Sequence, residues 1–218
     1  MSLTIYGIAA SRAIRPLWAA CELAVPFQHV PTPYQGGATR TADFLAINPN
    51  GHIPVLVDER AQGPVVVWES MACALYLAQE HGQHDGIDIS PAGAAEQAEA
   101  LRWSFWTLTE LEKDALTVLA HRRTMPVEQR KPELAEAAER RLRVPLRVLE
   151  HHLQQWATQL GGVDTYLAGA RFTVADVCVA SVVNWVRASE VLEDFPAVKA
   201  WSKRCLDRPA HRQARSMG

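Results

Sequence analysis

The sequence predicts an α/β domain followed by an all-helical domain. Residues 1–80 alternate between short strand-like runs and helical patterns, whereas almost everything after residue 91 has helical periodicity. The length of 218 residues suits one large or two small domains, and the change of pattern favours two. Between them, residues 81–91 are polar and contain two glycines, which is typical of a linker. We therefore expect domains over residues 1–80 and 92–218.

In the first domain, the opening residues predict a β-α-β unit. Leu3–Tyr6 and Phe27–Val30 are strand-like, and apolar residues recur at near-helical spacing from Ser11 to Ala24. Two strands joined by a crossover helix form a parallel pair. An antiparallel hairpin over Pro54–Asp58 and Pro64–Trp68, and a helix over residues 69–79, complete the domain.

The second domain is predicted to begin with two long helices, over residues 94–121 and 132–160. Thr173 and Asp176 have the spacing of a capping box, which starts a largely uncharged and therefore buried helix. For Asp176 this structural role outweighs a catalytic one. A last helix is expected over residues 196–206, with Pro209 as its stop signal.

Composition excludes several classes of protein. With 48% hydrophobic and 21% charged residues the chain is too apolar to be disordered. Its formal charge of −2 argues against a nucleic-acid binder, which needs a dense basic surface. No apolar run reaches the roughly 18 residues of a membrane span, and Leu3–Ala10 lacks the basic lead of a signal peptide. We expect a cytoplasmic protein with a small ligand and no membrane or nucleic-acid partner.

The cysteines show no sign of a metal or redox site. They are far apart, with no C-x-x-C pair and no zinc-type spacing, and are expected to be buried free thiols: Cys21, Cys73, Cys178 and Cys205. We therefore expect no metal cofactor.

Four motifs across both domains resemble the cytosolic glutathione transferase family. They are Asn48–Leu56, Trp68–Ser70, Tyr166–Gly169 and Phe195–Val198, and the match extends over nearly the whole chain. The resemblance implies a thioredoxin-like first domain, a helical second domain and a homodimer. It also implies an enzyme that conjugates the thiolate of glutathione to a small hydrophobic electrophile.

The resemblance assigns the glutathione contacts. It implies a cis peptide bond before Pro54, so that the backbone N–H and C=O of Ile53 pair with the cysteinyl part of glutathione like an added strand. Glu69 and Ser70, at a predicted helix start, would bind the γ-glutamyl ammonium and carboxylate groups. His52 occupies a position where relatives contact the tripeptide backbone. Without the resemblance, Pro54 reads as a strand start, Ser70 as a helix cap and His52 as a surface residue.

For the group that activates the glutathione sulfur, the sequence leaves several candidates open. Ser11 lies between the first strand and the first helix, where serine- and cysteine-type members of the family carry their catalytic residue. Its hydroxyl would either stabilise the thiolate or only cap the helix. Tyr6 and a backbone amide are the alternatives. The electrophile pocket is expected beside this loop and the first long helix, where Trp103 and Trp106 are either a wall or core residues.

The same fold allows other functions. A glutathione-dependent isomerase or peroxidase would use glutathione as a returning cofactor, and a non-catalytic member would bind glutathione or a partner protein. Thiol–disulfide exchange is less favoured because the loop after the first strand contains no cysteine.

Overall fold

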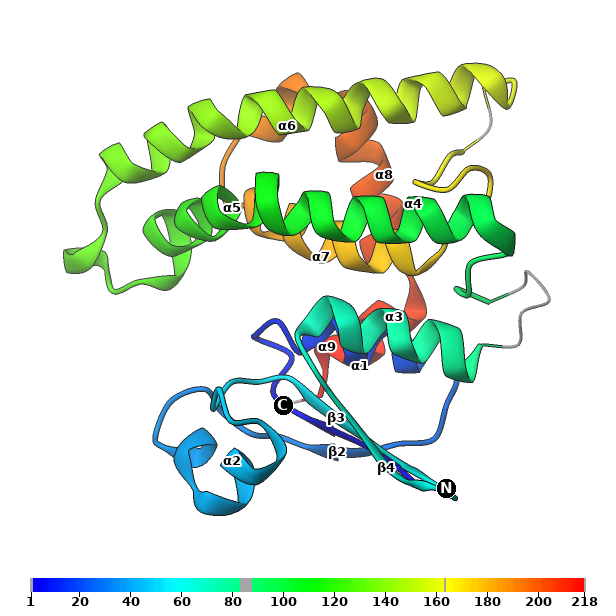
Figure 1. The fold of residues 1–218 in the computed structure, drawn as a ribbon. Helices are drawn as coiled ribbons and strands as arrows, with labels where there is room; N and C mark the ends of the chain where they lie inside the picture. Colours follow the sequence, from blue (N-terminus) through cyan, green and yellow to red (C-terminus); the bar gives the residue numbers. More distant parts are fainter. Residues whose placement is uncertain (1, 83–87, 163, 218) are drawn as a thin grey trace. The chain divides into compact units, whose positions relative to one another are not determined.

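The computed structural model describes residues 2–82, 88–162 and 164–217 (Figure 1). The chain divides into two units, one formed by Met1–Ala92 with Arg208–Gly218 and the other by Gly93–Asp207. The C-terminal residues thus belong to the first unit, although the sequence pattern places them with the second domain. Residues 83–87 of the predicted linker lie outside the described residues.

The first unit contains a four-stranded mixed sheet in the order β2-β1-β3-β4. Its strands are β1 (Leu3–Tyr6), β2 (Gln28–Val30), β3 (Val55–Arg60) and β4 (Gly63–Trp68). β1 and β2 are parallel, whereas β1–β3 and β3–β4 are antiparallel. This arrangement confirms the predicted β-α-β unit followed by a hairpin.

Helices cover one face of this sheet. α1 (Ile14–Glu22) and α3 (Ser70–His81) pack together, and the β1 side chains of Leu3 and Ile5 are buried. In Figure 1 both helices lie on the same side of the sheet, while α2 (Ala42–Ile47) follows a short 3-10 turn at Ala38–Arg40.

The first unit also contains a helix that the sequence pattern did not predict. α9 (Pro209–Arg215) begins at Pro209, which starts a new helix instead of only ending the previous one. The ring centroids of Trp18 in α1 and His211 lie 4.6 Å apart. Beside them, Arg208 donates two hydrogen bonds of 2.7 Å to the carboxylate of Glu22. These contacts place α9 against α1.

Apart from its connecting segments, the described part of the second unit consists of helices, as predicted. Its first predicted helix is divided by π-helical turns, in the order α4 (Gly93–Trp106), Thr107–Leu111, α5 (Glu112–Leu119) and Ala120–Thr124. It continues through a 3-10 turn (Val127–Gln129), α6 (Pro132–Gln159), α7 (Val174–Val186), a 3-10 turn (Val191–Asp194) and α8 (Pro196–Leu206). Of the helices in the described part of the chain, none has the length and apolar content needed to span a bilayer.

α7 forms the core of this unit, and the predicted capping box at its start is confirmed. Asp176 is fully buried and accepts hydrogen bonds from the Thr173 backbone at 2.8 Å and from its hydroxyl at 3.3 Å. It also accepts from the Leu167 N–H and from Trp201 Nε1, each at 2.9 Å. Burial raises the pKa of Asp176 to about 6, although these bonds act to lower it. The side chain therefore joins three segments of the unit.

Candidate functional site

Strand register brings three loop segments to one end of the sheet in the first unit. Tyr6 lies opposite Val55, and Val55 lies opposite Trp68. The residues after β1, before β3 and after β4 therefore meet at the same edge. A Cβ placed on Gly7 would lie 3.5 Å from Cβ of Ile53, which shows how closely the first two segments approach. These are the segments in which the sequence placed its candidate residues.

The segment before β3 presents open backbone groups. The Ile53–Pro54 peptide bond is cis, and Pro54 is buried. Neither the N–H nor the C=O of Ile53 has a hydrogen-bond partner among the residues that the structure describes. Both groups are therefore available to an extended peptide, which would add to the sheet as a further strand.

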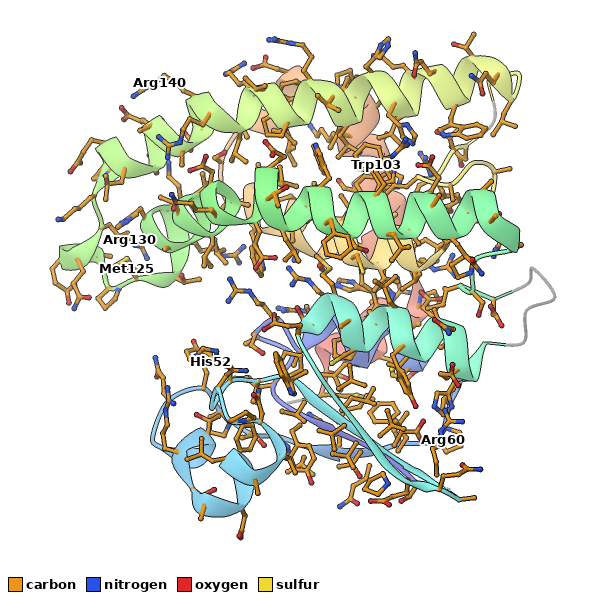
Figure 2. The ribbon with its side chains drawn as sticks, in the orientation of Figure 1. His52, Arg60, Trp103, Met125, Arg130 and Arg140 are labelled. Atoms are coloured by element: carbon orange, nitrogen blue, oxygen red, sulfur yellow. The ribbon has the colours of Figure 1, made fainter. Side chains whose placement is uncertain are left out.

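The turn that leads into this segment is held by Asn48 and Gly51. Asn48 Nδ2 donates a 2.7 Å hydrogen bond to the backbone C=O of His52. Gly51 has φ +62°, and a Cβ there would lie 2.9 Å from the Thr39 carbonyl oxygen, so only glycine fits without strain. The side chain of His52 is exposed, on the loop that joins α2 to β3 in Figure 2.

Glu69 connects β4 to α3 in an unusual backbone conformation. Its φ of +73° and ψ of 117° are rare for a residue other than glycine and cost about 1–3 kcal/mol. The side chain is exposed at the start of α3, where the first N–H groups have no partner inside the helix. Strain of this kind occurs at binding sites, and a helix start attracts anions.

Ser70, the first residue of α3, is bonded to a buried arginine. Arg15 Nη1 donates a 2.6 Å hydrogen bond to Ser70 Oγ, and both residues are buried. Since Oγ accepts this bond, its own proton is left to donate to a ligand. The guanidinium adds positive charge to that of the helix start, so the arrangement suits a carboxylate. Sequence reasoning did not connect Arg15 with Ser70, because 55 positions separate them.

Ser11 makes two local hydrogen bonds. Its hydroxyl donates to the Ile8 C=O at 2.7 Å and accepts from the Ala13 N–H at 3.1 Å. α1 begins at Ile14 with Ala13 at the N-cap position, so Ser11 closes the turn before the helix. To reach a bound sulfur, the hydroxyl proton must leave Ile8.

The alternative hydroxyl, that of Tyr6, belongs to a side chain that packs on α2. The ring centroids of Tyr6 and Phe44 are 6.2 Å apart in an edge-to-face arrangement. Such a contact is typical of a tyrosine with a packing role.

The loop after β1 is held by residues distant in sequence. His29 Nε2 donates to the Gly7 C=O at 2.7 Å. From the C-terminal segment, Arg215 Nη1 donates to the Ala9 C=O at 3.2 Å, while the Ala9 N–H donates to the Met217 C=O at 3.4 Å. The sequence pattern missed this support because it ended the last helix before Pro209.

The cysteines form no disulfide, and three of the four are buried. Desolvation raises the pKa of Cys21 to about 11 and that of Cys73 further, so neither is a reactive thiolate at neutral pH. Among the described residues, no group of three or more His, Cys, Asp or Glu side chains is placed to hold a metal ion.

Comparisons with known proteins agree with this architecture. The glutathione S-transferase N-terminal domain model matches residues 11–80, and the C-terminal domain model matches residues 109–209. Glutathione S-transferase 3 of Zea mays is 31% identical, with 95% of this chain and 90% of the relative covered. The disulfide-bond oxidoreductase YfcG of Escherichia coli is 33% identical, with 83% and 78% covered.

The fold of this chain is also found in solved structures. The structure of Ure2p in complex with glutathione has a TM-score of 0.83 and 22% identity, with 98% of this chain and 94% of that chain covered. Both family domains occur here in order, and the relatives align with most of the chain. The chain belongs to the glutathione transferase family.

Proposed function

We propose that this protein conjugates the thiolate of glutathione to a small hydrophobic electrophile. The observation that carries the proposal is the pairing of open backbone groups at Ile53 with an anion-binding helix start at Ser70 and Arg15. A peptide with a carboxylate at one end fits both features. Relatives named glutathione S-transferase and the solved complex of Ure2p with glutathione support this ligand.

Each part of glutathione has a counterpart in the site. Its γ-glutamyl carboxylate would accept hydrogen bonds from the Ser70 hydroxyl and from the free N–H groups of α3. Glu69 would bind the neighbouring ammonium group, and Ile53 would pair with the cysteinyl backbone. His52 would contact the tripeptide backbone beyond it.

The glutathione sulfur would then face the loop after β1, since Ile53 lies against Gly7. A thiol with a pKa of about 8.5 is only about 3% ionised at pH 7, so the site must stabilise the thiolate. A hydrogen bond to a charged group contributes about 1.5–3 kcal/mol, which lowers such a pKa by about one to two units. The Ser11 hydroxyl would supply this bond after turning from Ile8. Backbone N–H groups of the same loop are the alternative donors.

A second candidate function is glutathione-dependent reduction of an external disulfide. The observation that favours it is the relative named disulfide-bond oxidoreductase. In this reaction two glutathione thiols would be oxidised to one glutathione disulfide, while the S–S bond of the substrate is cleaved and its two sulfurs take up the two protons as thiols. The protein would only bind and activate glutathione, because the loop after β1 contains no cysteine.

Calorimetry of two matched glutamate variants tests the binding site. Glu69→Ala removes the proposed ammonium contact. Glu59→Ala is the control: this exposed glutamate of β3 pairs with Pro64 near the β3–β4 turn, at the other end of the strand from the three loop segments. We expect Glu69→Ala to weaken glutathione binding about tenfold or more and Glu59→Ala to leave it unchanged. Equal affinity in both variants would remove the site assignment.

Turnover assays then decide between the functions. The wild-type protein should conjugate glutathione to at least one of an aryl halide, an epoxide or an isothiocyanate. Disulfide reduction without any conjugation would select the second candidate, and peroxide reduction alone would select a peroxidase. Glutathione binding without any of these activities would identify a non-catalytic member and reject the transferase proposal.

A further inference from the structure

The side chain of His29 in β2 reaches the loop that follows β1. Its Nε2 lies 2.7 Å from the carbonyl oxygen of Gly7. A carbonyl oxygen only accepts hydrogen bonds, so Nε2 carries the proton and donates it. Among the residues that the structure describes, this is the one hydrogen bond of the His29 side chain. The polar role of His29 is therefore directed at this loop.

Gly7 is the residue at which the loop passes between the start of α1 and the segment before β3. Its φ is +138°, and a Cβ there would lie only 2.5 Å from Cβ of Ala13. A residue other than glycine would be strained in this conformation and this space. The backbone N–H of Gly7 donates to the Val30 C=O at 3.0 Å. Both polar groups of Gly7 are thus bonded toward β2.

The bond from His29 fixes the direction of the next backbone N–H, that of Ile8. The Gly7–Ile8 peptide bond is trans, so its C=O and N–H point in opposite directions. β1 lies between β2 and β3 in the sheet. Because the Gly7 C=O points toward β2, the Ile8 N–H points toward β3 and the Ile53 segment that precedes it. This N–H has no hydrogen-bond partner among the described residues.

An open N–H at this place suits a thiolate. In the proposed complex, the cysteinyl backbone of glutathione pairs with Ile53 and its sulfur faces the loop after β1. The Ser11 hydroxyl must leave the Ile8 C=O before it can bond to sulfur, whereas the Ile8 N–H is already free. A fixed donor aimed at a developing negative charge stabilises that charge without reorganisation during the reaction.

We propose that His29 is a positioning residue, which holds the Ile8 N–H toward the sulfur of bound glutathione and so stabilises the thiolate. The inference rests on the proposed function and names the side chain that orients its activating donor. His29 acts through the Gly7–Ile8 peptide and not by contact with the substrate. Without the bond from His29 this peptide is free to rotate, since glycine permits many backbone conformations. The thiolate then loses part of a charge-assisted hydrogen bond.

Three variants test the role of His29. His29→Phe keeps a ring but removes the donor, whereas His29→Gln keeps an N–H donor at the end of the side chain. His81→Phe is the matched control, because this half-buried histidine of the same unit also bonds through Nε2, at 2.8 Å to Asp58. Arg60 bonds to the same carboxylate, and in Figure 2 it lies toward the other end of the sheet from His52. Thermal melts of each variant check the fold.

The pH dependence of the bound thiol is the decisive measurement. Thiolate absorbance should show the pKa of bound glutathione raised by about one unit in His29→Phe, and by less than about 0.3 units in His29→Gln and His81→Phe. Below this pKa, kcat for conjugation should fall about tenfold in His29→Phe, because the thiolate fraction falls by that factor. At a pH above both pKa values the rates should converge, with KM for glutathione changed by less than about twofold.

The amide proton of Ile8 gives a direct signature of the donor. In protein that is isotope-labelled at isoleucine, its NMR signal should move downfield as bound glutathione ionises, with the same pKa as the thiolate absorbance. S-methylglutathione has no ionisable thiol and should cause no such pH-dependent shift. His29→Phe should reduce the shift, and His81→Phe should leave it unchanged.

Two results would overturn the inference while the proposed function stands. One is an unchanged pKa of bound glutathione in His29→Phe, and the other is an Ile8 signal that does not respond to ionisation of the thiol. An equal loss of rate at every pH in His29→Phe would assign His29 a purely structural role and also reject the inference. A wild-type protein that binds no glutathione in calorimetry would instead reject the proposed function, and this inference with it.

Discussion

Arg15 Nη1 donates a 2.6 Å hydrogen bond to Ser70 Oγ and so joins α1 to the first residue of α3. Both residues are buried, and the bond orients the serine hydroxyl while a positive charge lies behind it. The proposed binding of an anion at this site would therefore depend on two helices together. For residues that act as a unit, the effects of the two substitutions on binding are expected not to add.

A double-mutant cycle on this pair tests the coupling. Ser70→Ala removes the hydroxyl and Arg15→Lys replaces the planar guanidinium with a point charge, so each should weaken glutathione binding about tenfold. The double variant should bind glutathione with about the affinity of the weaker-binding single variant. Calorimetry measures the three affinities, and fully additive losses would show that the two residues act independently.

Ser11→Ala separates activation of the sulfur from support of the loop. If the hydroxyl bonds to the thiolate, the pKa of bound glutathione should rise by about one to two units. Loss of the bonds to Ile8 and Ala13 should also lower stability by about 0.5–2 kcal/mol. Thiolate absorbance against pH and the melting temperature report the two effects. A stability loss with an unchanged titration would leave activation to the backbone N–H groups.

Asp176→Asn should destabilise the helical unit by about 2–4 kcal/mol. The amide has only one acceptor oxygen, so some of the donors from Thr173, Leu167 and Trp201 lose their partner. Chemical denaturation at pH 7 measures this loss. A change below about 0.5 kcal/mol would contradict the structural role.

The raised pKa of the Asp176 carboxyl predicts that the stability of the folded chain depends on pH. Its pKa is raised to about 6 in the folded chain, against about 4 when unfolded. The folded state therefore binds this proton more tightly than the unfolded state does. The stability that this protonation contributes is complete below about pH 4 and is lost as the pH rises to about 6. The stability advantage of the wild type over Asp176→Asn should accordingly shrink over that range. An advantage that grows instead would show a lowered pKa.

Arg215→Ala should loosen the loop after β1 because its bond to Ala9 is lost. Hydrogen exchange at the amides of residues 9–13 should become faster, while the sheet stays protected. Lys203→Ala in α8, which removes an exposed lysine, is the control and should leave that loop unchanged. Equal exchange in the two variants would show that the C-terminal segment does not support the loop.

Homodimer formation, implied by the family resemblance, is testable through exposed apolar side chains of α4 and of the π-helical turn that follows it. Leu101, Phe105 and Leu108 are 50%, 64% and 39% exposed. Cys73 and Leu77 of α3, by contrast, are fully buried in their own unit. Light scattering at micromolar concentration should give twice the chain mass, and Phe105→Glu should reduce it. A wild-type monomer would reject the prediction.

Local patterns in the sequence were sufficient for the elements and their order. Period-two and helical spacing located β1 to β4 and α1, and the Thr173–Asp176 spacing located the start of α7, because these features depend on neighbouring residues. The first long helix lies where it was predicted, over residues 94–121, but it is not one uninterrupted α-helix. π-helical turns divide it, and a residue pattern does not distinguish a single π turn from a continued α-helix.

The family motifs likewise identified the candidate contacts Ile53, Glu69 and Ser70, while their chemical setting required the tertiary structure. The bond from Arg15 to Ser70, the direction of the Ser11 hydroxyl and the support of Ala9 by Arg215 join residues whose relation is geometric. A hydrogen bond depends on distances of tenths of an ångström, which sheet register and helix packing set after distant segments have met. The sequence thus determined the elements and the family, and the three-dimensional packing decided which groups are occupied and which remain open to a ligand.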